Sequence, residues 1–315
     1  MRRKLPAFLF FLVAPLVHPQ VVPTEFDSDR IFVIANAANG ARVRFFTDTG
    51  GGWNAISDAT QARLKLPQDG DVDIDAGRAP LVDAGALFDH AKIPAPDRDE
   101  PWLHGKLVVA PVDQFLQSDG TLGSRWFAGH IWDIDYGRRT MRVLTSTPST
   151  AGFREVPMGF VVDENGRRRL NFPRITIAVD GRDIDVLLDT GASAKLTPGA
   201  AGVLGHAAGA DIGTSFVIRS IFDRWRSAHP GWRTLPDADA RGGLPMIEVP
   251  RVRIGGIDVG PVWFTSRPDP NFLEFMSQMT DETVRGAVGG SALKYLRVVL
   301  DYPGAKMYLR KAAAE

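Results

Sequence analysis

The sequence lacks cysteine and has few histidines, and both absences restrict the chemistry open to it. With no cysteine in 315 residues, disulfide bonds, thiol catalysis and cysteine-ligated metal sites are excluded. The six histidines lie far apart and none is four residues from another, so their spacing predicts no zinc site. The 37 basic residues balance the 37 acidic ones, and we therefore expect no nucleic-acid partner.

Several other signals are weak or missing. The glycine run at 50–52 lacks the Gly-Lys-Ser/Thr ending of a phosphate-binding loop, and Ser291 lies in Gly-Gly-Ser-Ala-Leu, which is not a nucleophile elbow. Long amphipathic helices are scarce, and the best pattern covers 221–228, with apolar residues at 221, 222, 225 and 228. The 32 glycines and 22 prolines suit many short strands joined by turns. The sequence therefore predicts the all-β class, mainly β with short helices.

What the sequence does contain is the triplet Asp-Thr-Gly twice, at 48–50 and 189–191. Composition alone gives a particular triplet in about one chain in ten of this length. Each copy follows a stretch of polar/apolar alternation that finishes apolar, which is typical of a strand with a buried end. An earlier strand and a tight turn, Asn39-Gly40 or Asp180-Gly181, come before each stretch. Each triplet is therefore predicted to follow the second strand of a hairpin.

The residues after the triplets also match. A capped short helix is predicted at 58–64 after the first triplet and at 197–201 after the second. Both halves then show a glycine, an apolar helical stub, a strand into Asp-Tyr, a turn and a last strand, ending near 144 and 309. This order indicates an internal repeat with a period of one lobe. The second half is longer by about 25 residues, and we expect the helix at 221–228 and its flanks to account for them.

The chain has two Asp-Thr-Gly turns, each followed further along by an apolar-apolar-Gly sequence, and in this it resembles the aspartic peptidases. Its closing pattern, Gly-Gly-Ser-Ala-Leu followed by Leu-Asp-Tyr-Pro-Gly, is similar to that of bacterial retropepsin-like proteases. The resemblance covers about residues 30 to 311 and is closer in the second half. It implies two tandem retropepsin-like β-barrel lobes, at 28–145 and 153–311, with the active site between them in an acid-protease fold. A peptide or protein is the implied substrate, and no cofactor or metal is implied.

The resemblance also implies roles for particular residues. Asp48 and Asp189 would form the catalytic dyad and share a water, with one proton between two carboxyl groups about 3 Å apart. Thr49 and Thr190 would brace the loops through hydroxyl-to-backbone hydrogen bonds, and Gly50 and Gly191 would let the loops turn tightly. Further residues expected to support the two loops are Leu122, Gly123, Val288, Gly289 and Ser193.

This chain departs from the family at two points. Gly51-Gly52-Trp53 follows the first triplet where Ser or Ala is usual, and no tyrosine precedes Tyr136, so the usual flap tyrosine is missing. Trp53 or Trp102 is the expected substitute over the cleft. The alternative to an aspartic endopeptidase is a catalytically inactive peptide-binding or scaffold protein on the same fold. Glycoside hydrolysis also uses two carboxyl groups, but only scattered tryptophans favour it.

The chain begins with a basic tripeptide at 2–4 and a short apolar run at 5–17. This pattern predicts that residues 1–20 are a signal peptide or a short N-terminal anchor, and that the protein is exported, periplasmic or secreted. No good cleavage site follows the run, so membrane association through an uncleaved segment is the second interpretation. The polar, proline-containing stretch at 145–152 is the predicted linker between the lobes.

Overall fold

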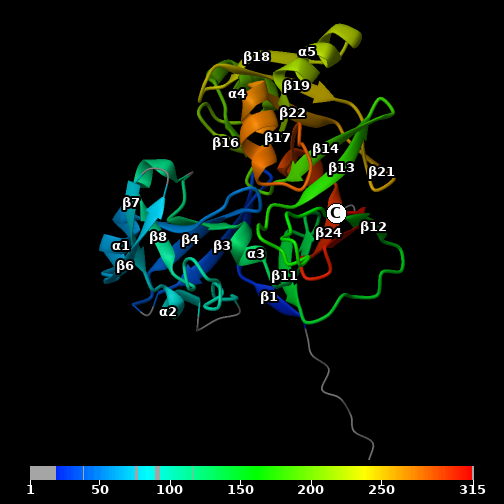
Figure 1. The fold of residues 1–315 in the computed structure, drawn as a ribbon. Coiled ribbons are helices and arrows are strands. Elements are labelled where there is room, and N and C mark those ends of the chain that lie inside the picture. Colours follow the sequence, from blue (N-terminus) through cyan, green and yellow to red (C-terminus); the bar gives the residue numbers. More distant parts are fainter. Residues whose placement is uncertain (1–18, 38, 75–76, 89–92, 116, 314–315) are drawn as a thin grey trace, which may run out of the picture.

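The computed structural model describes residues 19–37, 39–74, 77–88, 93–115 and 117–313. Over these residues the protein is mainly β with short helices, as the sequence predicts. Figure 1 shows the first half of the chain on one side in blue and cyan, and most of the second half above it in green to orange. Strands from both halves meet in a third sheet below.

The first half forms an eight-stranded sheet. Its third strand ends at Asp48, and the hairpin before it turns at Gly40, whose φ of 80° suits glycine. In order across the sheet the strands are β2 (Thr24–Asp27), β3 (Arg30–Asn36), β4 (Arg42–Asp48), β9 (Gly120–Gly123), β5 (Asn54–Ser57), β8 (Leu107–Ala110), β7 (Gly77–Val82) and β6 (Gln68–Ile74).

The second half forms a nine-stranded sheet. The hairpin before the second triplet turns at Asp180-Gly181, and both residues have positive φ, as a type I′ turn requires. In order the strands are β18 (Thr234–Asp239), β19 (Leu244–Val249), β22 (Val262–Arg267), β17 (Ser215–Ile218), β23 (Gly286–Val288), β14 (Arg182–Leu188), β13 (Arg174–Val179), β20 (Val252–Ile254) and β21 (Ile257–Val259).

The two large sheets have corresponding strand orders. The strand that leads into each triplet, β4 or β14, pairs in parallel with a strand ending in an apolar-Gly region, β9 or β23. The next strand outward, β5 or β17, is antiparallel to that strand and parallel to β8 or β22. Each large sheet thus contains two parallel pairs among antiparallel ones. Parallel neighbours need a long crossover connection, and here the chain makes such connections after each triplet before it returns to the sheet.

The short helices correct one detail of the sequence interpretation. The sequence pattern paired the helix at 58–64 with the helix predicted at 197–201, which is α4 (Pro198–Leu204). However, α4 follows β15 (Ser193–Lys195), and β15 pairs with β16 (Asp211–Gly213) in a separate two-stranded sheet. The counterpart of α1 (Asp58–Leu64) is α5 (Arg219–Ala228), because α5 follows β17 as α1 follows β5. Most of the additional length in the second half is therefore β15, α4 and β16, and the prediction that the helix at 221–228 supplies it is wrong.

The remaining helices are short. Ser57 caps α1 by accepting a hydrogen bond from the Thr60 amide, and Thr197 caps α4 with Pro198 in the first helical position. In α5 the apolar face is buried at Ile221, Phe222 and Trp225. The others are α2 (Gly85–Phe88), η1 (Val112–Gln114), α3 (Ser124–Phe127), the π-helical turn η2 (Asn271–Phe275), η3 (Met276–Gln278) and α6 (Gly290–Leu293).

A six-stranded sheet joins the two halves. Its central strands pair antiparallel and come one from each half, so that Ile131 lies opposite Asp301 and Asp135 opposite Arg297. Each central strand is flanked on its outer side by the strand with which it forms a hairpin, and beyond that strand lies an edge strand. In order the strands are β1 (Gln20–Val22), β11 (Thr140–Leu144), β10 (Ile131–Asp135), β24 (Leu296–Asp301), β25 (Lys306–Lys311) and β12 (Arg154–Pro157).

The predicted N-terminal segment at 1–20 and the predicted linker at 145–152 can be compared with the structure. The predicted signal segment lies outside the described residues except for its last two, and β1 begins at Gln20. The predicted linker at 145–152 contains no strand or helix and leads directly into β12. Among the residues that can be placed, no helix is long and apolar enough to cross a membrane.

The buried ion pair in the six-stranded sheet gives a test of how the halves are joined. Asp133 on β10 is 2% exposed, and Arg297 on β24 donates to both of its oxygens at 2.7 and 2.8 Å. We expect Arg297→Met to lower the free energy of unfolding by about 3 kcal/mol, because a buried carboxylate loses its main partner. Urea unfolding measures this. Arg253→Met removes a similar but exposed pair with Asp258 and should cost much less; equal losses would contradict the account.

Candidate active site

The two Asp-Thr-Gly triplets lie at equivalent strand ends. Asp48 is the last residue of β4, and Asp189 directly follows β14. Each strand end is held by its parallel neighbour: Asp48 lies opposite Gly123 on β9, and the Asp189 amide donates to the Val288 carbonyl at 2.9 Å. The two carboxylates therefore leave the two sheets from corresponding positions.

The threonines of the two triplets form a reciprocal pair of hydrogen bonds. The Thr49 amide donates to the Thr190 hydroxyl at 3.1 Å, and the Thr190 amide donates to the Thr49 hydroxyl at 2.9 Å. Each hydroxyl also donates across the interface, Thr49 to the Leu188 carbonyl at 2.7 Å and Thr190 to the Thr47 carbonyl at 3.2 Å. Both threonines are fully buried, so these four bonds tie the loops together without competition from water.

The glycines let each loop approach the opposite carboxylate. A Cβ on Gly50 would lie 2.5 Å from Cγ of Asp189, and one on Gly191 would lie 2.3 Å from Cγ of Asp48. Neither distance is tolerable, so any other residue at these positions would push the aspartates away. The same glycines donate their amides to the aspartate of their own triplet, at 3.0 Å to Asp48 and 2.9 Å to Asp189.

The downstream pairs Leu122-Gly123 and Val288-Gly289 lie against the triplet loops. A Cβ on Gly123 would meet the Trp53 carbonyl at 2.4 Å, and one on Gly289 would meet the Thr214 carbonyl at 2.3 Å. Leu122 and Val288 are fully buried beneath the loops. These four residues therefore pack tightly against the segments that carry the triplets.

Sequence reasoning missed two buried polar residues beside the triplet loops. The Gly123 amide donates to Oδ1 of Asn54 at 3.0 Å, and the Gly289 amide donates to the Ser215 hydroxyl at 3.1 Å. Asn54 and Ser215 are the first residues of the equivalent strands β5 and β17, so a strand-by-strand alignment of the halves would have paired them. Ser193, which the resemblance includes among the supporting residues, donates its hydroxyl to the Gly191 carbonyl at 2.9 Å.

The two carboxyl groups perturb each other. Asp189 is 8% exposed and Asp48 is half-buried. Burial, the nearby charge of Asp48 and the contact between the carboxyl groups raise the pKa of Asp189 well above its usual range. Burial also raises the pKa of Asp48, while the contact with Asp189 and the amides of Gly50 and Gly51 oppose that rise. The pair therefore holds one proton at a pH where two isolated aspartates would both be charged.

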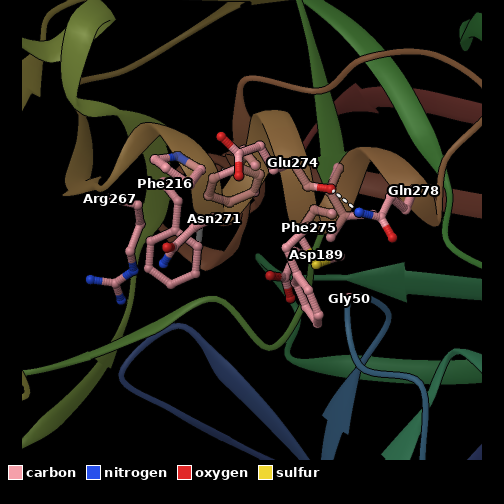
Figure 2. Close-up of a pocket in the computed structure, with 12 residues that line it drawn as sticks. Gly50, Asp189, Phe216, Arg267, Asn271, Glu274, Phe275 and Gln278 are labelled. Carbon is pink, nitrogen blue, oxygen red and sulfur yellow. Dashed lines mark hydrogen bonds between the residues drawn. The ribbon is translucent and has the colours of Figure 1, made fainter.

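Two pockets adjoin the triplet loops. The first, of about 680 Å³, is lined by Asp189, Phe216, Arg267 and Glu274 among others (Figure 2) and is called here the Asp189-side pocket. The second, of about 800 Å³, is lined by Gly52, Trp53, Trp102 and Phe172 among others and is called the Trp53-side pocket. Gly50, Phe275 and Met276 line both.

The two tryptophans expected to cover the cleft form one wall of the Trp53-side pocket. Their ring centroids are 4.4 Å apart, and the Arg125 guanidinium lies 4.6 Å from the Trp102 ring. Asp73 and Ile74, from the end of β6, reach the same pocket, so the β6–β7 hairpin also borders it. The site is thus bordered by aromatic side chains of the first half and by the 270–279 segment of the second half.

No group of three or more His, Asp or Glu side chains is arranged to hold a metal ion within the described part of the chain. The chain was also compared with known proteins. No protein-family model matches it, and no curated protein matches it either.

The threonine pair generates a stability prediction. Thr49→Val keeps the shape of the side chain but leaves the buried Thr190 amide and Leu188 carbonyl without partners, so we expect a loss of about 2 to 4 kcal/mol in the free energy of unfolding. Thr190→Val should cost a similar amount. Thr176→Val, which removes an exposed hydroxyl that donates to Asp185, is the matched control. Urea denaturation compares the three, and a loss at Thr49 no larger than at Thr176 would refute the bracing role.

The raised pKa of Asp189 generates a pH prediction. Its ordinary value is 3.8, so the unfolded chain ionises this group more easily and the folded state loses stability as the pH rises above that value. Asp189→Asn removes this penalty. We expect the variant to match wild type near pH 3 and to become progressively more stable than wild type as the pH rises. Melting temperatures at several pH values measure this, and a difference independent of pH would contradict it.

Proposed function

We propose that this protein is an aspartic endopeptidase in which Asp48 and Asp189 activate one water molecule between two lobes of an acid-protease fold. The observation that carries the proposal is the pair itself. Two carboxyl groups from equivalent loops are in contact and largely removed from solvent, and the pKa of each is raised, that of Asp189 well above its usual range. A water held between such groups faces one acceptor and one donor, which is the arrangement that general acid–base hydrolysis needs.

In the proposed first step, the charged carboxylate takes a proton from the water while the water oxygen attacks the carbonyl carbon of the scissile peptide. The protonated carboxyl gives its proton to the carbonyl oxygen. The product is a tetrahedral intermediate with two hydroxyl groups on the former carbonyl carbon. The pair still holds one proton, now on the other carboxyl, and its charge has not changed.

In the second step the carboxyl that gained the proton donates it to the amide nitrogen. One hydroxyl of the intermediate returns its proton to the other carboxylate, the C–N bond breaks, and an acid and an amine leave. The pair regains its starting state. The short contacts at Gly50 and Gly191 support this cycle because they fix both carboxylates while the proton changes sides.

The proposed two-lobed, duplicated architecture is supported by the corresponding strand orders of the large sheets and by the sheet to which both halves contribute. Each half supplies a β-hairpin, a triplet, a parallel return strand and a closing hairpin in the same order. A peptide in extended form would lie between the halves, across both triplets, and bind partly through main-chain hydrogen bonds.

The rival proposal is a peptide-binding or scaffold protein that does not catalyse. The intact triplets and the raised pKa values favour the enzyme, since a scaffold gains nothing from a buried pair of carboxyl groups that lowers its stability at neutral pH. We also propose that the protein is exported, to the periplasm or outside the cell, with residues 1–20 as a signal or an anchor, because of the basic and apolar start of the chain.

Cleavage of a mixed peptide library from pH 3 to 8 tests the proposal. We expect wild type to cleave, and Asp48→Asn and Asp189→Asn each to lose at least a hundredfold in kcat/KM, because each loses a proton donor or acceptor. The control is Asp183→Asn, an exposed aspartate on β14, the strand that leads to Asp189; it should retain wild-type activity. Folded wild type inert at every pH would favour the binding protein, and loss in only one of the two dyad variants would exclude a shared water.

A further inference from the structure

The 270–279 segment, between β22 and β23, lines both pockets beside the triplet loops. It contains η2 and η3 and appears in orange near the centre of Figure 1. Phe275 and Met276 line both pockets, as does Gly50 of the first triplet. Figure 2 shows Phe275 projecting from the segment toward Asp189 and Gly50. Phe275 therefore borders both pockets close to Asp189.

The segment is fixed in place rather than loosely attached. Phe272 is 5% exposed and packs in the core, with its ring 6.4 Å from that of Phe216. The Ser277 hydroxyl donates to the Phe272 carbonyl at 2.6 Å and accepts from the Val284 amide at 3.0 Å. The Gln278 side chain donates to the Glu274 carbonyl at 2.7 Å. These contacts hold the backbone beneath Phe275 on both sides.

Phe275 itself is 56% exposed, although an aromatic ring normally gains from burial. It lines both pockets beside the triplet loops, where the substrate of the proposed peptidase would lie. In an extended peptide, successive side chains point to opposite faces, so residues two apart face the same wall about 7 Å from one another. A residue opposite Phe275 meets the ring, while residues two positions away on either side reach the two pockets.

We propose that Phe275 is a specificity-determining residue that restricts one position beside the scissile bond to small side chains. Resting on the proposed function, this predicts substrates with Gly, Ala or Ser at that position and larger side chains two residues away on either side. The pockets of about 680 and 800 Å³ have room for large side chains, whereas a side chain opposite Phe275, which borders both pockets, would meet its ring.

The test compares cleavage profiles of wild type and Phe275→Ala on the mixed peptide library. The wild-type profile should show small residues at one of the two positions that flank the cut. Phe275→Ala should raise kcat/KM for peptides with Leu or Phe at that position at least tenfold relative to peptides with Ala there. Leu273→Ala is the matched control, because Leu273 is also exposed, at 39%, on the same segment but lines neither pocket. Its profile should equal that of wild type.

A binding measurement separates this inference from the proposed function. Peptides that carry Ala or Phe at each position in turn are titrated against Asp189→Asn and against Asp189→Asn combined with Phe275→Ala. For one position, the second protein should bind the Phe peptide at least tenfold more tightly than the first, whether or not wild type cleaves. Cleavage by wild type with an unchanged profile in Phe275→Ala would overturn the inference and leave the peptidase proposal intact. A protein that neither cleaves nor binds these peptides would overturn both.

Discussion

The reciprocal hydrogen bonds of Thr49 and Thr190 are the constraint on which the site depends. Two loops from separate sheets meet there, and each threonine satisfies a buried amide of the other loop. Buried amides without partners cost stability, so the loops cannot separate without losing all four bonds. The loops are tied at this point, and Gly50 and Gly191 each lie against the aspartate of the other triplet, so the carboxyl groups of Asp48 and Asp189 are held in contact.

The burial of this pair lowers stability as the pH rises, and other parts of the fold must offset that loss. Because burial raises both pKa values, the unfolded chain ionises these groups more easily than the folded protein does. The sheet shared by the halves and its buried pair of Asp133 with Arg297 hold the halves together against this cost. A site that transfers protons requires carboxyl groups with shifted pKa values in fixed positions. The proposed peptidase activity uses these two groups directly.

The features that the sequence predicted are those encoded by short stretches. Hairpins at Asn39-Gly40 and Asp180-Gly181, the cap at Thr197 and the apolar face of α5 follow from local turn, cap and periodicity rules. The counterpart of α1 was misassigned because two capped helices follow the second triplet, and only strand pairing shows that β15 belongs to a separate sheet. The position of Phe275 depends on contacts across the fold, and no local pattern around 270–279 indicates that it faces Asp189.

Direct titration of the dyad tests the central claim most closely. Carboxyl carbon NMR of aspartate-labelled protein, with Asp48→Asn and Asp189→Asn to assign the signals, follows the ionisation of both groups from pH 2 to 8. The account predicts two coupled steps, the later one well above 3.8, and a shift in the step that remains when either partner is replaced. Two independent steps near 3.8, each unaffected by loss of the other aspartate, would contradict a shared proton and with it the proposed mechanism.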